Sequence, residues 1–394
     1  MAQGTDRILT THVGSLIRPD ALRNLLIAHE EGRPYDPAEL DRLLDEATRA
    51  VARKQAATGI DIINDGEFRK HRGWMMYIID RLGGLTPEDG GAGVIPTLAG
   101  KDWSDFADFY AELNRDVPRN ANQQSWKVTG PIRYVGQEAV QRDIAAMKRA
   151  TEGLDAADVF MTAVAPASVI PGGLDRHLSS DRDFLFQLAE ALREEYRAIV
   201  DAGFIVQIDD AYLATTYDVM VPPGTLQDYR RWAELRIDAL NHALEGLPEE
   251  RTRYHVCWGS WHGPHSNDVE IKHIVDLVLK VKVGGYSLEM ANPRHEHEWR
   301  VWETAKLPDG RKLLPGVVTH STNVVEHPEL VAERIVRLAR LVGRENVIGS
   351  TDCGFAQSPY TRRTHDKIMW AKLASLVEGA RLATQQLWGR RAAA

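Results

Sequence analysis

The chain has two cysteines, and both stand where a metal ion could be held. Cys257 closes the apolar run 254–257, and Cys353 follows another apolar run, 346–351. Each run has the length of a buried strand. His255 lies two residues before Cys257, so on a strand the two side chains point to the same face. An imidazole together with thiolates is a ligand set that suits zinc.

Two more polar residues, Glu289 and His320, follow apolar runs of the same kind. Two thiolates, one imidazole and one carboxylate would complete a tetrahedral zinc site. Such a site carries a net negative charge, because the two positive charges of zinc face three negative ligands. An electron-rich zinc activates water poorly, but it keeps a substrate thiol in its reactive thiolate form. The predicted reaction class is therefore alkyl transfer to a thiol.

Other interpretations of the same residues stay open. Cys353 could be an inert small residue of the core. A zinc ion could be purely structural, although structural sites usually draw closely spaced ligands from loops and not from separate strands. A barrel that binds or senses a small thiol without transforming it would keep both cysteines, but it would need no acid such as His320.

The segments that carry these residues repeat one pattern: an amphipathic helix, a glycine, and a short apolar run that ends in polar residues. One helix is predicted to begin with Asp36 as its cap and Pro37 at its first position, and to end at Gly59. The pattern returns after Ser180 and again after Pro328. Strands that alternate with helices indicate a parallel sheet.

The expected fold is a (β/α)₈ TIM barrel with its polar residues at the C-terminal ends of the strands. A doubly wound open sheet is the alternative, but the sequence has neither a G-x-G-x-x-G nor a Walker loop. We expect one domain, 1–394, with an inserted, lid-like segment at about 83–125 that is rich in glycine, proline and aromatic residues. Nine candidate strands compete for the eight places of the barrel, near 10–14, 60–65, 127–132, 159–164, 204–209, 253–257, 284–289, 315–319 and 346–351.

Composition excludes several classes of protein. A net charge of −8, a pI near 6.0 and the lack of a dense basic run argue against nucleic-acid binding. No apolar stretch reaches 18 residues, and the first residues lack the apolar core of a signal peptide, so we expect a cytoplasmic protein without a membrane partner. The expected partners are small molecules, a thiol and an alkyl donor. The sequence does not indicate an oligomeric state.

Seven motifs follow one another along the chain: THVGS at 11–15, DGE at 65–67, QIDD at 207–210, HVC at 255–257, LE at 288–289, HSTN at 320–323 and DCG at 352–354. With these motifs, in this order, the chain resembles the C-terminal catalytic barrel of cobalamin-independent methionine synthase. It resembles the shorter single-barrel relatives of that enzyme still more closely. The resemblance covers nearly the whole chain and implies a barrel of the methionine synthase and uroporphyrinogen decarboxylase type.

The resemblance implies a role for individual residues. Zinc would be bound by four side chains: His255, Cys257, Glu289 and Cys353. The turn formed by Gly14 and Ser15 would bind the carboxylate of homocysteine, and His12 of the same motif is counted among the substrate-binding residues. Glu67 and Asp209 would hold the ammonium group of the amino acid.

His320 is implied as the acid that protonates the leaving group, and Asp209 is counted with it as catalytic. The named activity is methionine synthesis from homocysteine and a methyl-folate or a simpler methyl donor. At two positions the sequence departs from the family pattern for binding these substrates. Thr215 stands where the long synthase has a glutamate, and no tryptophan corresponding to the folate-stacking one follows 161–166.

Two alternatives come from the same superfamily. In an epoxyalkane:coenzyme M transferase a zinc-bound thiolate opens an epoxide, and uroporphyrinogen decarboxylase uses no metal at all. A further segment, His295–Glu298, has the H-x-H spacing of a second metal site. We interpret it as a solvated, charged loop at the mouth of the barrel.

Overall fold

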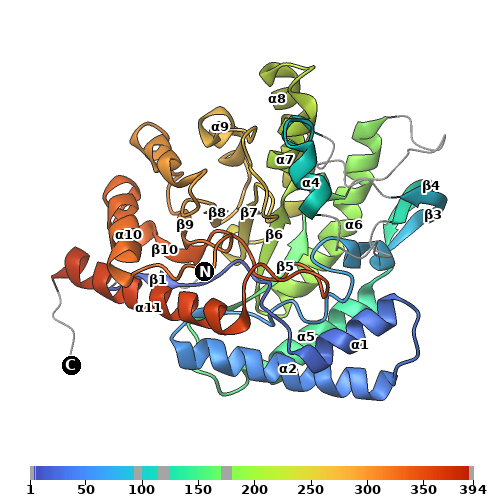
Figure 1. Ribbon diagram of the computed structural model, residues 1–394, viewed down its shortest axis with the longest axis horizontal. Coiled ribbons are helices and arrows are strands. Elements are labelled where there is room, and N and C mark those ends of the chain that lie inside the picture. Colours follow the sequence, from blue (N-terminus) through green and yellow to red (C-terminus); the bar gives the residue numbers. More distant parts are fainter. Residues whose placement is uncertain (1–3, 5, 93–99, 114–123, 170–179, 390–394) are drawn as a thin grey trace.

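The computed structural model describes residues 4, 6–92, 100–113, 124–169 and 180–389. Eight strands form one parallel sheet in the order β1-β10-β9-β8-β7-β6-β5-β2. Helices surround these strands (Figure 1). The strands are β1 Leu9–Thr10, β2 Ile62–Ile63, β5 Asp158–Val164, β6 Ile205–Asp210, β7 Thr252–Val256, β8 Gly285–Leu288, β9 Lys312–Val318 and β10 Ile348–Thr351.

The two ends of this sheet, β1 and β2, meet. The amide of Asp61 donates a hydrogen bond to the carbonyl oxygen of Thr10 at 3.2 Å. The carboxylate of Asp61 accepts from the amide of Thr10 at 2.8 Å, and the hydroxyl of Thr11 donates to the carbonyl oxygen of Ile62 at 3.0 Å. The sheet is therefore a nearly closed barrel, and the predicted TIM-barrel fold is confirmed.

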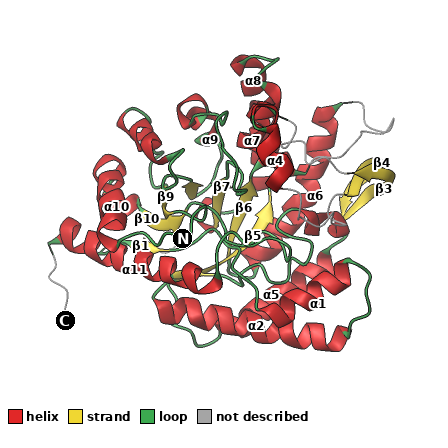
Figure 2. Ribbon diagram, in the orientation of Figure 1, coloured by secondary structure: helices red, strands yellow, loops and turns green. Residues whose placement is uncertain are grey.

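Helices cover the outside of the barrel (Figure 2). None of the helices in the described ranges is both long and apolar enough to cross a membrane. The longer helices are α1 Asp20–Glu30, α2 Pro37–Thr58, α5 Gln137–Thr151, α6 Asp181–Asp201, α7 Tyr212–Met220, α8 Leu226–Leu244, α10 Pro328–Val342 and α11 Asp366–Trp388. The short ones are α3 Lys101–Asp105, α4 Ala107–Leu113 and α9 Val275–Val278, with 3₁₀ turns at Met76–Arg81, Pro166–Ser168, Glu249–Arg251, Ile271–His273, Glu296–Glu303 and Arg344–Asn346.

Helix α2 shows how the sequence sets these elements. The carboxylate of Asp36 accepts a hydrogen bond from the amide of Ala38 at 2.9 Å, and Pro37 occupies the first helical position, where its missing N–H costs nothing. Gly59 ends the helix with φ at 92°, a left-handed conformation that glycine adopts without strain. The predicted start and end of this helix are confirmed, and the chain turns directly into β2.

The ninth candidate strand, near 127–132, lies outside the barrel. It belongs to β4 (Gln124–Tyr134), which pairs in antiparallel fashion with β3 (Leu82–Ala92) as a separate two-stranded sheet. Both strands extend away from the barrel as a hairpin beside α6 (Figure 1). The alternating pattern of β4 fits a barrel strand and a hairpin strand equally well, so the sequence could not distinguish them.

The inserted segment also contains α3 and α4, which lie between β3 and β4 in the chain. The amide of Asp102 donates to the carboxylate of Asp218 in α7 at 3.0 Å, and the carboxylate of Asp102 accepts from the amide of Ser266 at 2.9 Å. The hydroxyl of Tyr110 accepts from the indole N–H of Trp261 at 3.0 Å. The segment therefore lies against α7 and against the loop that follows β7.

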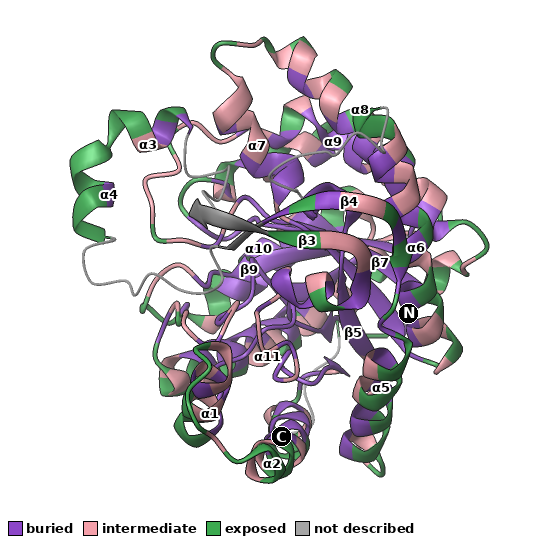
Figure 3. Cartoon of the chain, turned by 90° about the vertical axis from the view of Figure 1, so that its right-hand side faces the viewer, coloured by how far each residue is buried: buried purple, intermediate pink, exposed green. Residues whose placement is uncertain are grey.

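The barrel interior is filled by a small apolar layer and a buried arginine. Purple, buried residues dominate the strands in Figure 3. The guanidinium group of Arg253 lies 3.6 Å from the ring centroid of Phe160 and donates to Gln207 at 2.7 Å. It also donates to the carbonyl oxygen of His12 at 3.0 Å. These contacts fix the side chains that lie directly beneath the C-terminal ends of the strands. The apolar layer consists of Leu9, Ile62, Phe160, Ile205, Leu314 and Ile348.

Candidate metal and substrate site

The residues predicted to act in chemistry are carried by the C-terminal ends of neighbouring strands. Asp209 lies near the end of β6, His255 near the end of β7, and Cys257 directly after β7. Because Asp209, His255 and Ser287 are register partners across β6, β7 and β8, they stand at the same height on the rim. Cys353 follows β10. The parallel sheet therefore gathers these side chains at one end of the barrel.

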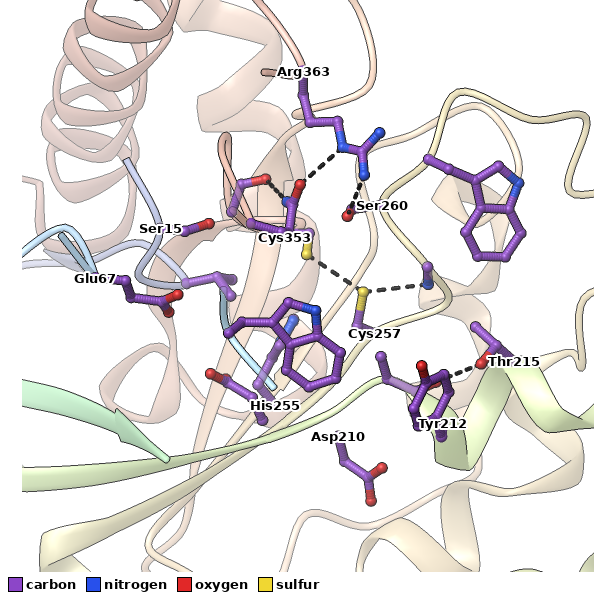
Figure 4. Close-up of a pocket in the computed structure, with 18 residues that line it drawn as sticks. Ser15, Glu67, Asp210, Tyr212, Thr215, His255, Cys257, Ser260, Cys353 and Arg363 are labelled. Carbon is purple, nitrogen blue, oxygen red and sulfur yellow. Dashed lines mark hydrogen bonds between the residues drawn. The ribbon is translucent and has the colours of Figure 1, made fainter. Parts of the chain in front are cut away.

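Two sulfur atoms and one imidazole form the centre of the site (Figure 4). The Sγ atoms of Cys257 and Cys353 are 3.4 Å apart, and one ligand atom from each of these cysteines and from His255 lies within 4.8 Å of the others. Two sulfurs bound to one tetrahedral zinc would be about 3.8 Å apart, whereas a disulfide bond is about 2.05 Å long. The spacing therefore fits a shared metal ion, and both cysteines are free thiols.

His255 is oriented as a ligand. Its Nδ1 lies 3.2 Å from the hydroxyl of Ser287, while its Nε2 is buried and has no hydrogen-bond partner among the described residues. This is the arrangement in which an outer partner fixes the ring and leaves the other nitrogen for a metal. Burial lowers the pKa of His255, which keeps the ring neutral and able to bind a metal.

The thiols of Cys257 and Cys353 can both ionise only if a cation lies close to their sulfur atoms. The hydrogen bond between Cys257 and Cys353, and after it burial, raise the pKa of Cys257 well above its ordinary value. Two thiolates so close together repel each other strongly in a buried site. A bound divalent metal reverses that effect, because a coordinated thiol is deprotonated. The donor set thus fits zinc.

Glu289 lies next to this group but outside it. One carboxylate oxygen accepts from the amide of Trp258 at 2.8 Å, and the other accepts from the side-chain amide of Asn292 at 2.8 Å. Burial, and after it the charges of Asp352 and Cys353, raise the pKa of Glu289 well above its ordinary value. Its place as the fourth zinc ligand stays a prediction.

A cavity of about 210 Å³ opens beside the sulfurs and is lined by Ser15, Glu67 and Asp209. This volume is smaller than the roughly 300–1,000 Å³ of pockets for drug-sized ligands, so it suits a molecule of amino-acid size. Glu67 accepts from the hydroxyl of Thr162 at 3.0 Å with one oxygen, and its other oxygen is buried without a partner among the described residues. The predicted substrate residues Ser15, Glu67 and Asp209 are therefore brought together.

The two acidic residues, Glu67 and Asp209, make this cavity negative. Burial and the neighbouring Glu67 raise the pKa of Asp209 to about 7. Glu67 also has a strained backbone, with φ at 60°, and its amide donates to the carboxylate of Asp65 at 2.9 Å. Strain of this kind persists where the surrounding structure holds a functional side chain in place. A pair of buried carboxylates favours a cationic guest, such as an ammonium group.

Gly14 lies beside the carboxylate of Glu67 at the cavity, whereas the ring of His12 lies away from it. A side chain at Gly14, whose φ is 140°, would place its Cβ 2.7 Å from the carboxylate of Glu67, so only glycine fits there. The ring of His12 is buried away from the cavity, with Nε2 2.7 Å from the side chain of Gln55, and burial lowers its pKa to about 4. The structure does not bring His12 to the cavity, because its ring packs between β1 and α2.

His320 lies on a second cavity of about 470 Å³, which Glu289 and His262 also line. The side chain is buried, and its Nδ1 has no hydrogen-bond partner among the described residues. Burial, with smaller contributions from Arg363 and nearby histidines, lowers the pKa of His320 well below its ordinary value. The structure therefore places the predicted acid beside the sulfur cavity, but not among its lining residues.

The segment His295–Glu298 is not the solvated loop that the sequence indicated. His295 is 3% exposed and Glu298 is 6% exposed. One ring nitrogen of His295 lies 3.0 Å from Glu298, and the other lies 3.0 Å from Asp268. These two carboxylates raise the pKa of His295 to about 10, although burial opposes them. The charges are buried as an ion-paired cluster, which a reading of the local sequence alone could not foresee.

Arg363 lines the same cavity, although the sequence analysis did not single it out. Thr215, where the resemblance implied a departure from the family pattern, lines the cavity as well. Arg363 stands in a Thr-Arg-Arg run with Arg362, which looks like a solvated surface pair. Only the fold of the loop between β10 and α11 shows that one of the two arginines turns inward. Three aromatic residues, Trp74, Tyr212 and Trp261, form much of the wall.

Comparisons with known proteins agree with this geometry. Residues 123–380 match the family model described as the catalytic domain of cobalamin-independent synthase. The methionine synthase of Sulfurisphaera tokodaii is 22% identical over 382 residues, which are 96% of this chain and 93% of that protein. The methionine synthase of Saccharolobus solfataricus is 24% identical, with coverage of 96% and 95%.

One solved structure also has this fold. The B12-independent methionine synthase from Shewanella sp. W3-18-1, in complex with selenomethionine, superposes with a TM-score of 0.67 at 22% identity. The match covers 98% of this chain and all of that one.

Proposed function

Because the chain belongs to the catalytic-domain family of cobalamin-independent methionine synthase, we propose that it transfers a methyl group to a thiol bound beside Cys257, Cys353 and His255. The observation that supports this proposal most strongly is the convergence of two sulfurs and an unpaired imidazole nitrogen on one point at the barrel rim. The cytoplasm, where thiols stay reduced, is the proposed location.

Zinc is the proposed cofactor, held by His255, Cys257 and Cys353, with Glu289 as the fourth ligand. When bound, zinc supplies the positive charge that lowers the pKa of a substrate thiol and keeps its sulfur nucleophilic. The carboxylate of Glu289 is oriented by hydrogen bonds from Trp258 and Asn292, which would hold it as an oxygen ligand beside the two sulfurs.

Homocysteine is the proposed acceptor. Its ammonium group would lie between Glu67 and Asp209, where two buried carboxylates face the cavity. The turn at Gly14 and Ser15 would place backbone N–H groups and a hydroxyl toward its carboxylate. The ligand of the Shewanella protein, selenomethionine, is the selenium analogue of the product that this reaction would give.

In the proposed transfer, the thiol loses its proton to solvent and its sulfur attacks the methyl carbon of the donor. The S–C bond forms as the bond from carbon to the leaving nitrogen breaks, and the electron pair stays on that nitrogen. His320 supplies a proton there. Its buried ring is neutral at rest, so it would take up a proton from solvent before it donates that proton to the leaving nitrogen.

The test is methyl transfer by purified, zinc-loaded protein. Homocysteine is offered with a methyl-folate, with its polyglutamate form, or with simpler methyl donors, and methionine is measured by mass spectrometry. Cys353→Ser is expected to lower the rate more than about hundredfold, since even the loss of an outer-shell partner costs about 10–100-fold. Arg362→Gln, an exposed change, serves as the control. Absence of methionine with every donor, while zinc stays bound, would contradict the proposal.

A further inference from the structure

Arg363 is a cation that reaches the sulfur cavity from the loop between β10 and α11. Its Nε donates to the side chain of Gln357 at 2.8 Å, and its Nη2 lies 3.3 Å from the hydroxyl of Ser260. Ser260 follows Cys257 closely in the chain, and Gln357 follows Cys353. The guanidinium group is therefore hydrogen-bonded to both segments that carry the sulfurs, and Figure 4 shows the contact with Ser260.

The charge of Arg363 has no carboxylate partner. Among the described residues, no Asp or Glu forms an ion pair with it. Burial lowers the pKa of Arg363 to about 10, and the nearby sulfurs of Cys353 and Cys257 act in the opposite direction, so the group stays positive near neutral pH. A guanidinium has five N–H donors, and the two contacts above use two of them. A partly buried cation with donors to spare favours an anionic ligand.

The position of Arg363 restricts which ligand this would be. No other Lys or Arg among the described residues lines the cavity, whereas Glu67 and Asp209 make its other part acidic. An ammonium group suits the two acids, and an anion suits the guanidinium. Since Arg363 is fixed to the segments beside both sulfurs, an anion bound there would be joined to a metal-bound thiol by a short spacer. Alkyl thiols with a terminal carboxylate or sulfonate have this form.

We propose that Arg363 determines acceptor specificity by binding, together with the turn at Gly14 and Ser15, the anionic group, a carboxylate or a sulfonate, of the thiol that enters the cavity. Ser15 and Arg363 line the same cavity, so both can contact one anionic group. This assignment rests on the proposed function for the reaction, and it adds the side chain whose positive charge selects the acceptor. Arg363 acts as a binding residue here and takes no part in the movement of protons.

A competing explanation is that Arg363 only balances the negative charge of the two thiolates. The two explanations differ in a measurable way. A counterion to the cysteines would affect the binding of every thiol alike, because all of them bind at the same metal. A ligand-binding arginine would affect thiols that carry an anionic group and leave the others nearly unchanged.

The experiment is isothermal titration calorimetry of the zinc-loaded protein with three thiols. Homocysteine carries a carboxylate, 3-aminopropane-1-thiol is homocysteine without it, and 2-mercaptoethanesulfonate carries a sulfonate. Arg363→Gln is expected to weaken the anionic thiols by about tenfold to hundredfold, the range for a lost hydrogen bond to a charged group. It should change the affinity of 3-aminopropane-1-thiol less than about threefold. The anionic thiol whose affinity falls more in Arg363→Gln carries the group that the site prefers.

Two further variants make the result decisive. Arg363→Lys keeps the charge and should restore part of the affinity for anionic thiols, and it replaces Arg363→Gln if that variant does not fold. Arg362→Gln, which alters the exposed neighbour that pairs with Asp20, should bind all three thiols as the unchanged protein does. Equal weakening of all three thiols by Arg363→Gln would overturn this assignment alone. Failure of every thiol to bind the unchanged protein would overturn the proposed function as well.

Discussion

Among the residues that line the cavity, Glu67 has the geometry most typical of a residue that binds a ligand. Its carboxylate has one buried oxygen without a partner among the described residues, and its backbone is held at a positive φ. Glu67→Gln removes the negative charge but keeps the shape of the side chain. We expect KM for homocysteine to rise about tenfold to hundredfold, the effect of one lost charged hydrogen bond, with a smaller change in kcat.

Steady-state kinetics of methyl transfer measure this effect, and Glu46→Gln on the exposed face of α2 is a suitable control. A fall in kcat at unchanged KM would place Glu67 in the chemical step and not in ammonium binding.

The cluster around His295 should make stability depend on pH. Its folded pKa of about 10 lies above the ordinary value near 6.5, so the folded state holds the proton more tightly than the unfolded chain does. The resulting stabilisation is complete below pH 6.5 and is lost as pH rises toward 10. The free energy of unfolding, measured by urea denaturation, should therefore fall between pH 7 and 9.5, on the order of a few kcal/mol.

In His295→Gln this slope should largely disappear. His297→Gln, a change at an exposed histidine of the same segment, should keep it. A slope that is identical in both variants would show that another group titrates.

Individual side chains also mark where sequence reasoning succeeds and where it fails. The convergence of His255, Cys257 and Cys353 follows from strand periodicity and from the rule that barrel strands end at one rim. The inward turn of Arg363 and the burial of His295 do not, because both depend on contacts with distant segments. His12 belongs to the same motif as Ser15, yet its ring packs toward α2, away from the cavity.

At the scale of secondary structure, a hydrogen bond connects α4 to a residue that lines the cavity. Trp261 lines the cavity and donates to the hydroxyl of Tyr110 in α4. If the segment acts as the predicted lid, binding of homocysteine should slow amide hydrogen exchange in residues 100–113. Tyr110→Phe removes the hydrogen bond and should abolish most of that protection.

Mass spectrometry of deuterated peptides measures the exchange. Peptides from 82–87 in the β3–β4 hairpin provide an internal control, since they lie outside the barrel. Protection that is unchanged in Tyr110→Phe would show that the segment does not respond to the ligand through Trp261.

Elements were predictable to the extent that their signals are local. The cap at Asp36 and the glycine at Gly59 define α2 because each acts on its own backbone. The strand near 127–132 was one of nine candidates for the eight places of the barrel, and only its antiparallel pairing with β3 shows that it lies outside.

For the whole molecule, a metal ion at this site would join strands that are not neighbours. Cys257 follows β7 and Cys353 follows β10, with β8 and β9 between them in the sheet. Zinc should therefore stabilise the folded barrel. Zinc in a thousandfold excess over its Kd contributes about 4 kcal/mol, and in a chain of this size that corresponds to roughly 5 °C in Tm.

Thermal unfolding with and without a chelator measures this shift. Cys353→Ser should begin with a low Tm and should not respond to the chelator. An equal response in the variant would mean that the stabilising metal binds elsewhere in the protein.

The metal-free decarboxylase alternative gains no support at this scale, because the matched family is that of the synthase. The nearly closed barrel itself could be foreseen from the alternation of helices and strands. Which strands meet at the seam could not, because β1 and β2 are only two residues long and are recognised by the hydrogen bonds between them.

The order of the strands has a consequence for how the protein is made. β1 pairs with β10, so β1 lacks this neighbour until the chain has been synthesised as far as β10. Cys353 follows β10, and with it comes the second sulfur. During synthesis the two thiols therefore cannot meet until residue 353 has left the ribosome, and the proposed metal ion would find its complete ligand set only after that.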